Sequence, residues 1–101
     1  MTKFALAYTR TRALDGEPYN FDEEERHLLA YADREGLIVL ATSLYDSFFL
    51  TEMLIERMRF WGASHLIISD RRHLRTQFAV HKTIEILNRA GITVHITPRI
   101  A

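Results

Sequence analysis

Short runs of apolar residues, separated by longer stretches of mixed polarity, divide this chain into a regular series of elements. The runs are rich in β-branched and aromatic side chains, which are typical of buried strands. They predict four strands, at Lys3–Arg10, Leu37–Ala41, His65–Ser69 and Ile92–Thr97. The runs Leu37–Leu40 and Leu66–Ile68 are continuously apolar, which predicts that the central strands are covered on both faces.

Between these runs, apolar residues recur at a spacing of three or four, which predicts three amphipathic helices. The first begins at Asn20 or Asp22, where acidic residues suit the positive end of a helix, and it ends at Glu35. The second extends from about Phe49 to Trp61 and the third from about Leu74 to Ala90. A glycine follows each helix and predicts its end: Gly36, Gly62 and Gly91. The predicted buried stripes are Leu28, Leu29, Tyr31 and Ala32; Met53, Leu54, Met58 and Trp61; and Phe78, Ile84 and Leu87.

Strand, helix and strand alternate three times, which is the pattern of parallel strands joined by right-handed crossovers. We therefore predict an α/β fold of three layers, with a four-stranded parallel sheet in the order 2-1-3-4 and three crossover helices. Ligands of such sheets bind at the carboxyl ends of the strands. Those ends carry Arg10, Arg12, Thr42–Asp46, Ser69–Arg72 and Thr97.

Length and composition fit one domain, residues 1–101, because 101 residues with 48% apolar content can form a single core. The chain has no cysteine, which excludes disulfides, a thiol nucleophile and cysteine-containing metal sites. No signal peptide or membrane span is predicted from the apolar runs. We expect a soluble, cytoplasmic protein.

The net charge is zero, but charge is distributed unevenly. Residues 1–56 contain five basic and eleven acidic side chains, whereas residues 57–101 contain eight basic and two acidic side chains. A field that would steer the whole protein to nucleic acid is therefore absent, although one face can still be basic.

The first strand resembles the opening of the serine recombinase catalytic domain, found in resolvases and invertases. In that family the strand ends in Tyr-x-Arg-x-Ser, and the serine attacks a DNA phosphodiester. Tyr8 and Arg10 fit this pattern, and Arg12 stands at the position of the serine. A guanidinium is protonated at neutral pH and is no nucleophile. Thr9 and Thr11 point to the other face of the strand.

The resemblance extends in order over nearly the whole chain, through Gly36–Val39, Leu66–Arg71 and Ala90–Ile96. Two features depart from it. The second arginine that the family carries after the third strand would be Arg72 or Arg75, but neither has the family's spacing. The loop Ser43–Phe48 lacks the glycine, arginine and proline that the family carries there. The resemblance therefore implies a resolvase-like fold without a nucleophile, and we predict no catalytic residue.

The arginines near the predicted carboxyl edge form the candidate phosphate or DNA site: Arg10, Arg12, Arg71, Arg72 and Arg75. In the family, positions of this kind surround a phosphate, and guanidinium groups match phosphate oxygens geometrically. The alternative is structural, with Asp70 paired to Arg10 or Arg71 and the remaining arginines solvated. The five histidines have no metal-site spacing, so we expect neither a metal ion nor a cofactor.

The second predicted helix and the residues before it carry more aromatic and methionine side chains than one buried stripe needs. The candidate interface residues are Phe48, Phe49, Met53, Phe60 and Trp61. Such side chains are favoured at protein interfaces. The alternative is that a small domain uses them for its core.

Three functions fit these observations. The first is an inactive recombinase-like domain that binds DNA, a recombinase or a second copy of itself, and that acts in DNA recombination or in a mobile element. The second is an α/β domain that binds or converts a small phosphorylated ligand. The third is an interaction module whose fold serves dimerisation alone. Binding to a membrane is not expected.

Overall fold

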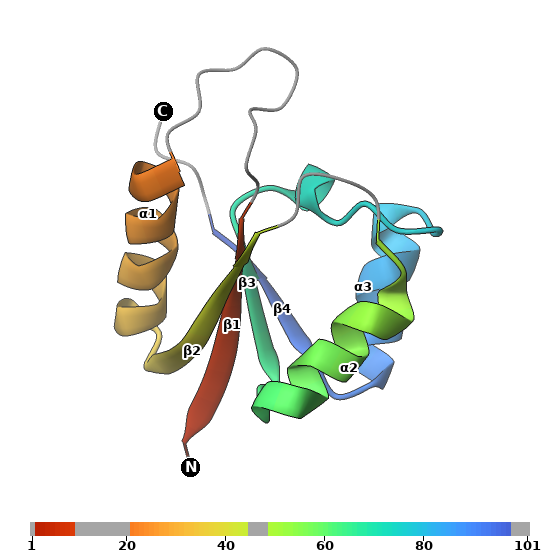
Figure 1. The fold of residues 1–101 in the computed structure, drawn as a ribbon, viewed down its shortest axis with the longest axis horizontal. Coiled ribbons are helices and arrows are strands. Elements are labelled where there is room, and N and C mark those ends of the chain that lie inside the picture. Colours follow the sequence, from red (N-terminus) through yellow and green to blue (C-terminus); the bar gives the residue numbers. More distant parts are fainter. Residues whose placement is uncertain (1, 10–20, 45–48, 98–101) are drawn as a thin grey trace.

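The computed structural model describes residues 2–9, 21–44 and 49–97. Strands and helices alternate along the chain, as Figure 1 shows. The strands are β1 (Lys3–Thr9), β2 (Leu37–Leu44), β3 (His65–Ile68) and β4 (Thr93–Ile96). The helices are α1 (Phe21–Arg34), α2 (Thr51–Trp61) and α3 (Val80–Arg89), with a short 3₁₀ turn, η1, at Arg71–His73.

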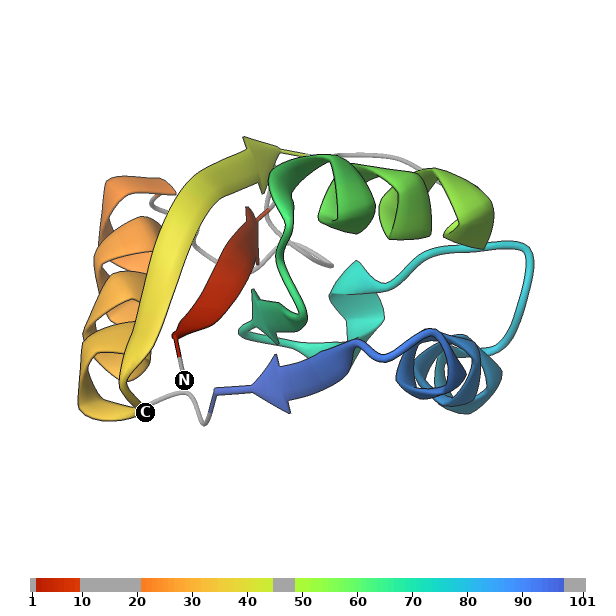
Figure 2. The ribbon, with the colours of Figure 1, turned by 90° about the horizontal axis from the view of Figure 1, so that it is seen from below.

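The four strands form one parallel sheet in the order β2-β1-β3-β4, which confirms the predicted fold class and strand order. Helix α1 covers one face of the sheet, and α2 and α3 cover the other (Figures 1 and 2). The molecule therefore has three layers, with β1 and β3 in the middle of the sheet.

Strand β1 separates the core into two halves because its side chains alternate between the two faces. Ala5 and Ala7 pack towards α1, together with Leu28 and Ala32 of that helix. Leu6 and Tyr8 belong to the larger cluster beneath α2 and α3. The α1 side is thus lined by small residues of β1, and the α2/α3 side by large ones.

The predicted third helix is wrong in its first part. Residues 74–79 are not helical: they follow the 3₁₀ turn at Arg71–His73, and α3 begins only at Val80. Thr76 provides a physical reason, because its hydroxyl accepts from the backbone N–H of Phe78 at 3.1 Å and hydrogen-bonds to Thr83 Oγ1 at 2.7 Å. Such local side-chain bonds compete with helix formation. Phe78 consequently precedes the helix and is 40% exposed.

The prediction that the central strands are covered on both faces holds for β3 but not for β2. Strand β2 lies at the edge of the sheet, and Ile38 is 49% exposed. Its register shifts between Val39, which pairs with Ala5, and Ala41, which pairs with Leu6. Leu40 is the extra residue of a β-bulge.

Some predicted buried stripes are corrected as well. Leu29, Met53 and Trp61 are exposed, whereas their neighbours Leu28, Leu54 and Met58 are buried. The glycines that were expected to end the helices adopt positive φ angles, between 68° and 83°. This left-handed backbone is favourable for glycine and ends a helix.

Candidate functional site

The carboxyl edge of the sheet gathers polar side chains from several elements. Strand β3 leads into Ser69 and Asp70, and β4 leads into Thr97. The first turns of α1 add Glu24 and His27 beside these strand ends. Parallel strands place their ends at one edge, so segments far apart in sequence meet here.

The turn after β3 is held by Asp70. Its Oδ1 accepts from the backbone N–H of Arg72 at 2.9 Å, and Arg72 Nη2 lies 2.7 Å from Oδ2. Hydrogen bonds from the Arg72 side chain, above all, lower the pKa of Asp70 to about 2. Asp70 is therefore ionised at neutral pH. Among the described residues its ion-pair partner is Arg72 and not Arg71, which was one of the two expected partners; the other, Arg10, lies outside these residues.

Arg71 and Arg75 belong to the same turn as this ion pair and are both exposed. Within the described part of the chain, neither side chain forms an ion pair with a carboxylate. Their backbone carbonyls hold the turn, because Leu74 N–H donates to Arg71 O at 3.1 Å and Phe49 N–H donates to Arg75 O at 2.9 Å. The backbone is fixed while these side chains remain in solvent.

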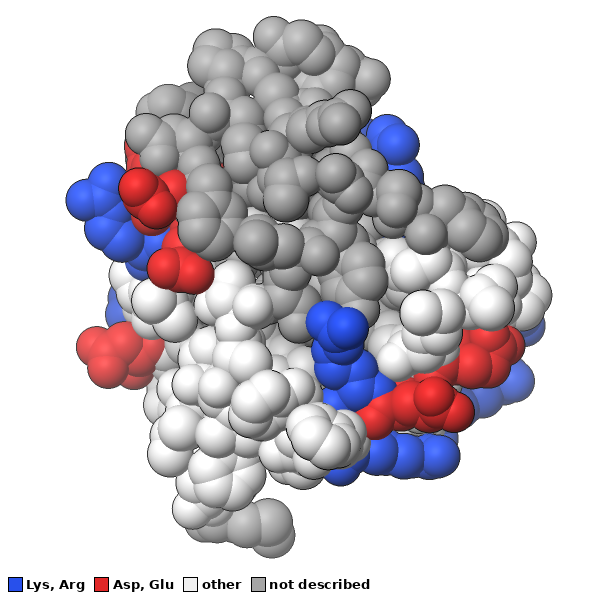
Figure 3. Space-filling view, viewed as in Figure 1, with Lys and Arg blue, Asp and Glu red and all other residues white. Residues whose placement is uncertain are grey.

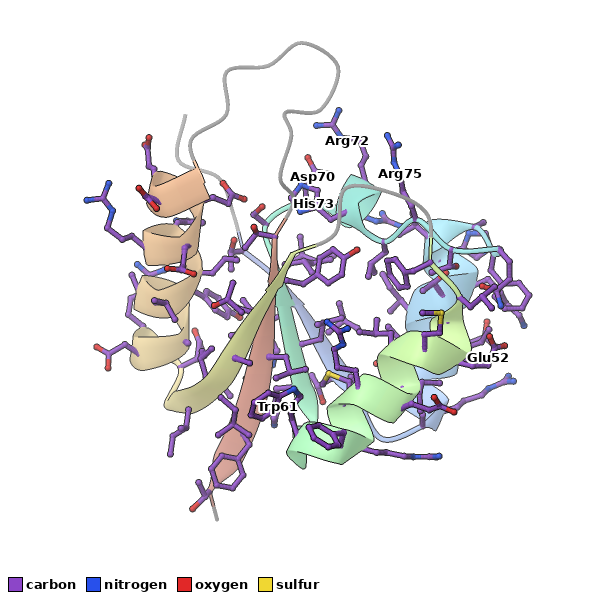
Figure 4. The ribbon with its side chains drawn as sticks, viewed as in Figure 1. Glu52, Trp61, Asp70, Arg72, His73 and Arg75 are labelled. Carbon is purple, nitrogen blue, oxygen red and sulfur yellow. The ribbon has the colours of Figure 1, made fainter. Side chains whose placement is uncertain are left out.

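Figure 4 shows Arg72 and Arg75 extending from this turn away from the sheet, beyond Asp70 and His73. His73 and Leu74 are buried and anchor the turn to the core. The structure thus brings together Arg71, Arg72 and Arg75 in one segment. Arg10 and Arg12, the other two predicted phosphate ligands, lie outside the described residues.

Two polar contacts at this edge, one buried and one partly buried, could not be predicted from the sequence. The Ser69 hydroxyl donates a hydrogen bond to Glu24 Oε1, and His27 Nε2 lies 3.0 Å from Thr97 Oγ1. The partners are 45 and 70 residues apart. Glu24 carries no local signal for such a role, because an acidic residue in the first turn of a helix already suits the helix dipole.

A second polar chain crosses the α1 side of the sheet. Tyr31 Oη lies 3.0 Å from His95 Nδ1, and His95 Nε2 lies 2.9 Å from His65 Nδ1. Burial lowers the pKa of both histidines, and burial raises the pKa of Tyr31. No cluster of three metal-ligating side chains occurs among residues 2–9, 21–44 and 49–97.

The predicted interface residues separate into two groups. Phe49 is only 5% exposed, and its ring packs 5.5 Å from that of Tyr8, so it belongs to the core. Met53, Phe60 and Trp61 are exposed on α2. The rings of Phe60 and Trp61 meet edge to face with centroids 5.8 Å apart. Phe48 lies outside the described residues.

Two exposed apolar residues beside this group were missed. Phe4 is 37% exposed and pairs in register with Ile38 at the start of β2. The backbone of Phe4 also accepts a hydrogen bond from Ser64, three residues after Trp61. The alternating pattern of these strands could not reveal the exposure, because it depends on how far α2 extends over the sheet.

The fold is similar to that of a solved structure, the C-terminal catalytic domain of ISC1926 TnpA, an IS607-like serine recombinase. The two structures superpose with a TM-score of 0.71 at 16% sequence identity, over 96% of this chain and 71% of the other. No protein-family model and no curated protein matches the sequence. No helix in the described ranges is long and apolar enough to cross a membrane.

Proposed function

We propose that this chain is a domain of the serine recombinase fold that binds DNA through its phosphodiester backbone and does not cleave it. The fold that it shares with a recombinase catalytic domain supports a role in DNA recombination. The single observation that carries the binding proposal is the turn after β3, where Arg71 and Arg75 are exposed in the same short segment as the Asp70–Arg72 pair.

Electrostatics favours an anion at this turn. Asp70 is neutralised by Arg72, so the guanidinium groups of Arg71 and Arg75 add positive charge that no described carboxylate balances. Guanidinium groups bind phosphate oxygens with paired N–H donors. Because buried His73 and Leu74 fix the backbone of the turn, phosphate binding has to order only the arginine side chains and not the backbone.

The absence of cleavage rests on Arg12. The resemblance of the first strand places this residue at the nucleophile position, and arginine cannot attack a phosphodiester. A guanidinium there would instead add a further phosphate donor to the edge. The polar residues Ser69 and Glu24 are buried and hydrogen-bonded to each other, so in this proposal they serve structure rather than reaction.

Binding is tested with fluorescently labelled duplex DNA, measured by anisotropy at two or more salt concentrations. Replacing both Arg71 and Arg75 by Ala is expected to weaken binding and to reduce the slope of log K against log salt by about 2. The matched control replaces Lys82 and Arg89 of α3 by Ala. Both side chains pair with Glu85, and their replacement removes the same amount of positive charge as the test variant. Equal losses for the two double variants would contradict the proposed site.

Cleavage is tested separately with supercoiled plasmid. We expect neither nicking nor a covalent protein–DNA adduct after denaturation. An adduct would overturn the non-cleaving role, and its position in the chain would identify the nucleophile. Competition of the labelled DNA by inorganic phosphate or a mononucleotide at low concentration would instead favour a small phosphorylated ligand at the same edge.

A further inference from the structure

Helix α2 has apolar side chains on its outer face as well as on its inner face. Thr51, Leu54 and Met58 are buried against the core. Met53 and Phe60 lie on the opposite side, seven residues apart, and are 51% and 83% exposed. The outer face of a surface helix is ordinarily polar, so two large apolar side chains here indicate a surface that binds a partner.

Charged residues on the same helix follow a simple order. Glu52 and Glu56 come first, and Arg57 and Arg59 follow. Figure 3 shows acidic and basic side chains close together over α2, with uncharged surface around them. An antiparallel copy of this helix reverses the order, so the acidic half of each helix would face the basic half of the other.

The antiparallel arrangement also places the exposed apolar residues of one copy opposite those of the other. With a two-fold axis between positions 56 and 57, Glu56 of one copy lies opposite Arg57 of the other. In that register Met53 lies opposite Phe60. The helix is therefore complementary to itself in charge and in apolar contact, as a two-fold interface requires.

We propose that two copies of this chain associate through α2, with the helices antiparallel about a two-fold axis between Glu56 and Arg57. Each interface then contains two Glu56–Arg57 ion pairs and two Met53–Phe60 contacts. Trp61 lies at the margin of the contact, and its ring already supports Phe60.

A second copy fits this face better than a partner of one charge sign. The face carries both signs in equal number, and the whole chain has no net charge to oppose association. The outermost acid, Glu52, accepts from Gln77 Nε2 at 3.2 and 3.3 Å within the same copy. Arg57 has five N–H donors, enough to bind the partner's carboxylate alongside its own contacts.

The helix is also a rigid support for such a contact. Its inner face is packed in the core, and Gly62 ends it with a left-handed turn whose N–H donates to Arg59 O at 3.1 Å. The proposed interface does not include the arginines of the turn after β3. Association through α2 is therefore independent of the DNA-binding proposal and can fail without it.

Sedimentation equilibrium at micromolar concentration tests the proposal by charge exchange. We expect the wild-type chain to form a dimer, and E56R or R57E alone to associate at least about tenfold more weakly, because each reversal sets like charges opposite each other twice. An equimolar mixture of E56R and R57E is expected to recover association, since the mixed dimer places two arginines of one copy opposite two glutamates of the other. The double variant E56R/R57E should recover it as well.

Two controls accompany these variants. D33R reverses an exposed acid on α1, on the far side of the sheet, and is expected to associate like the wild type. The pair M53S/F60S is expected to be monomeric with an unchanged circular dichroism spectrum. A wild-type monomer, a dimer that tolerates both reversals, or a mixture that associates no better than its components would overturn the proposal.

Discussion

The two faces of the sheet are held to their helices by different chemistry. On the α2/α3 side, large apolar residues such as Leu6, Leu54 and Met58 form one continuous cluster. On the α1 side the apolar cluster is smaller and is lined by alanines of β1. Side-chain hydrogen bonds add to it there: Glu24 with Ser69, His27 with Thr97, and Tyr31 with His95.

This difference indicates which perturbations destabilise each side of the sheet. Apolar burial depends on volume and hardly on pH, whereas buried carboxylates and imidazoles depend on their protonation state. We therefore expect the α2/α3 side to be sensitive to truncation and the α1 side to be sensitive to acid. The variants below separate these two kinds of stability, from the largest expected effect to the smallest.

Replacing Leu54 by Ala is expected to lower the free energy of unfolding by about 2–5 kcal/mol. The side chain is 2% exposed in the larger cluster, so its loss leaves a cavity that the neighbours fill only in part. Urea unfolding followed by circular dichroism measures the change. A loss below about 1 kcal/mol would mean that α2 packs more loosely than the structure indicates.

Replacing Ser69 by Ala is expected to cost about 1–3 kcal/mol, because Glu24 would lose a hydrogen bond in a buried position. The matched control is Ser64→Ala, at an exposed serine before β3. If both variants unfold at the same urea concentration as the wild type, the Glu24–Ser69 contact does not stabilise α1 on the sheet.

Acidification is expected to destabilise the α1 side through His65 and His95. Their pKa values are lowered in the folded state, so folding disfavours their protonated forms. The stability is complete above the ordinary pKa of 6.5 and is lost as the pH falls below it. When both histidines are protonated, an N–H of His65 faces an N–H of His95 across their 2.9 Å contact, and the two groups repel each other. The charge of Lys3 further disfavours protonation of His95, whereas the charge of Glu35 favours it.

Unfolding midpoints between pH 7.5 and 5 measure this effect. The variant H65Q/H95Q is expected to show a flatter profile than the wild type over this range. H81Q, at an exposed position on α3, is expected to keep the wild-type slope. A profile that is equally steep in both variants would assign the acid sensitivity to other groups.

Replacing Phe60 by Ser is expected to change the free energy of unfolding of the isolated chain by less than about 0.5 kcal/mol. Its ring is 83% exposed and adds little to the fold. The free energy of unfolding is measured at protein concentrations too low for association, so that the change reflects the fold of the single chain alone. A large loss would place Phe60 in the core and would remove the reason for its proposed role between copies.

Much of the fold follows from local pattern. The apolar runs and the glycines after the helices are properties of a few neighbouring residues, and the rules for parallel crossovers then leave only a few possible strand orders. The start of α3 was missed because Thr76 and Asp70 hold the backbone through side-chain bonds that a periodicity of apolar residues does not contain.

The site was predictable only in part. Arg71, Arg72 and Arg75 were recognised because they follow an apolar run directly. The Asp70–Arg72 pair depends on the geometry of a single turn, and the Glu24–Ser69 and His65–His95 contacts depend on tertiary packing. Phe49 could equally have been core or surface by its chemistry, and only its contact with Tyr8 decides between them.

The bulge at Leu40 affects how readily strand β2 can pair with a strand of another molecule. Strand β2 is an edge strand of eight residues without a charge, a proline or a glycine, which is the kind of edge that recruits further strands into aggregates. The extra residue bends this edge and interrupts its regular hydrogen-bonding repeat. We expect that deletion of Leu40 would keep Val39 and Ala41 paired with β1 but would leave a regular edge, which is more open to pairing with another chain.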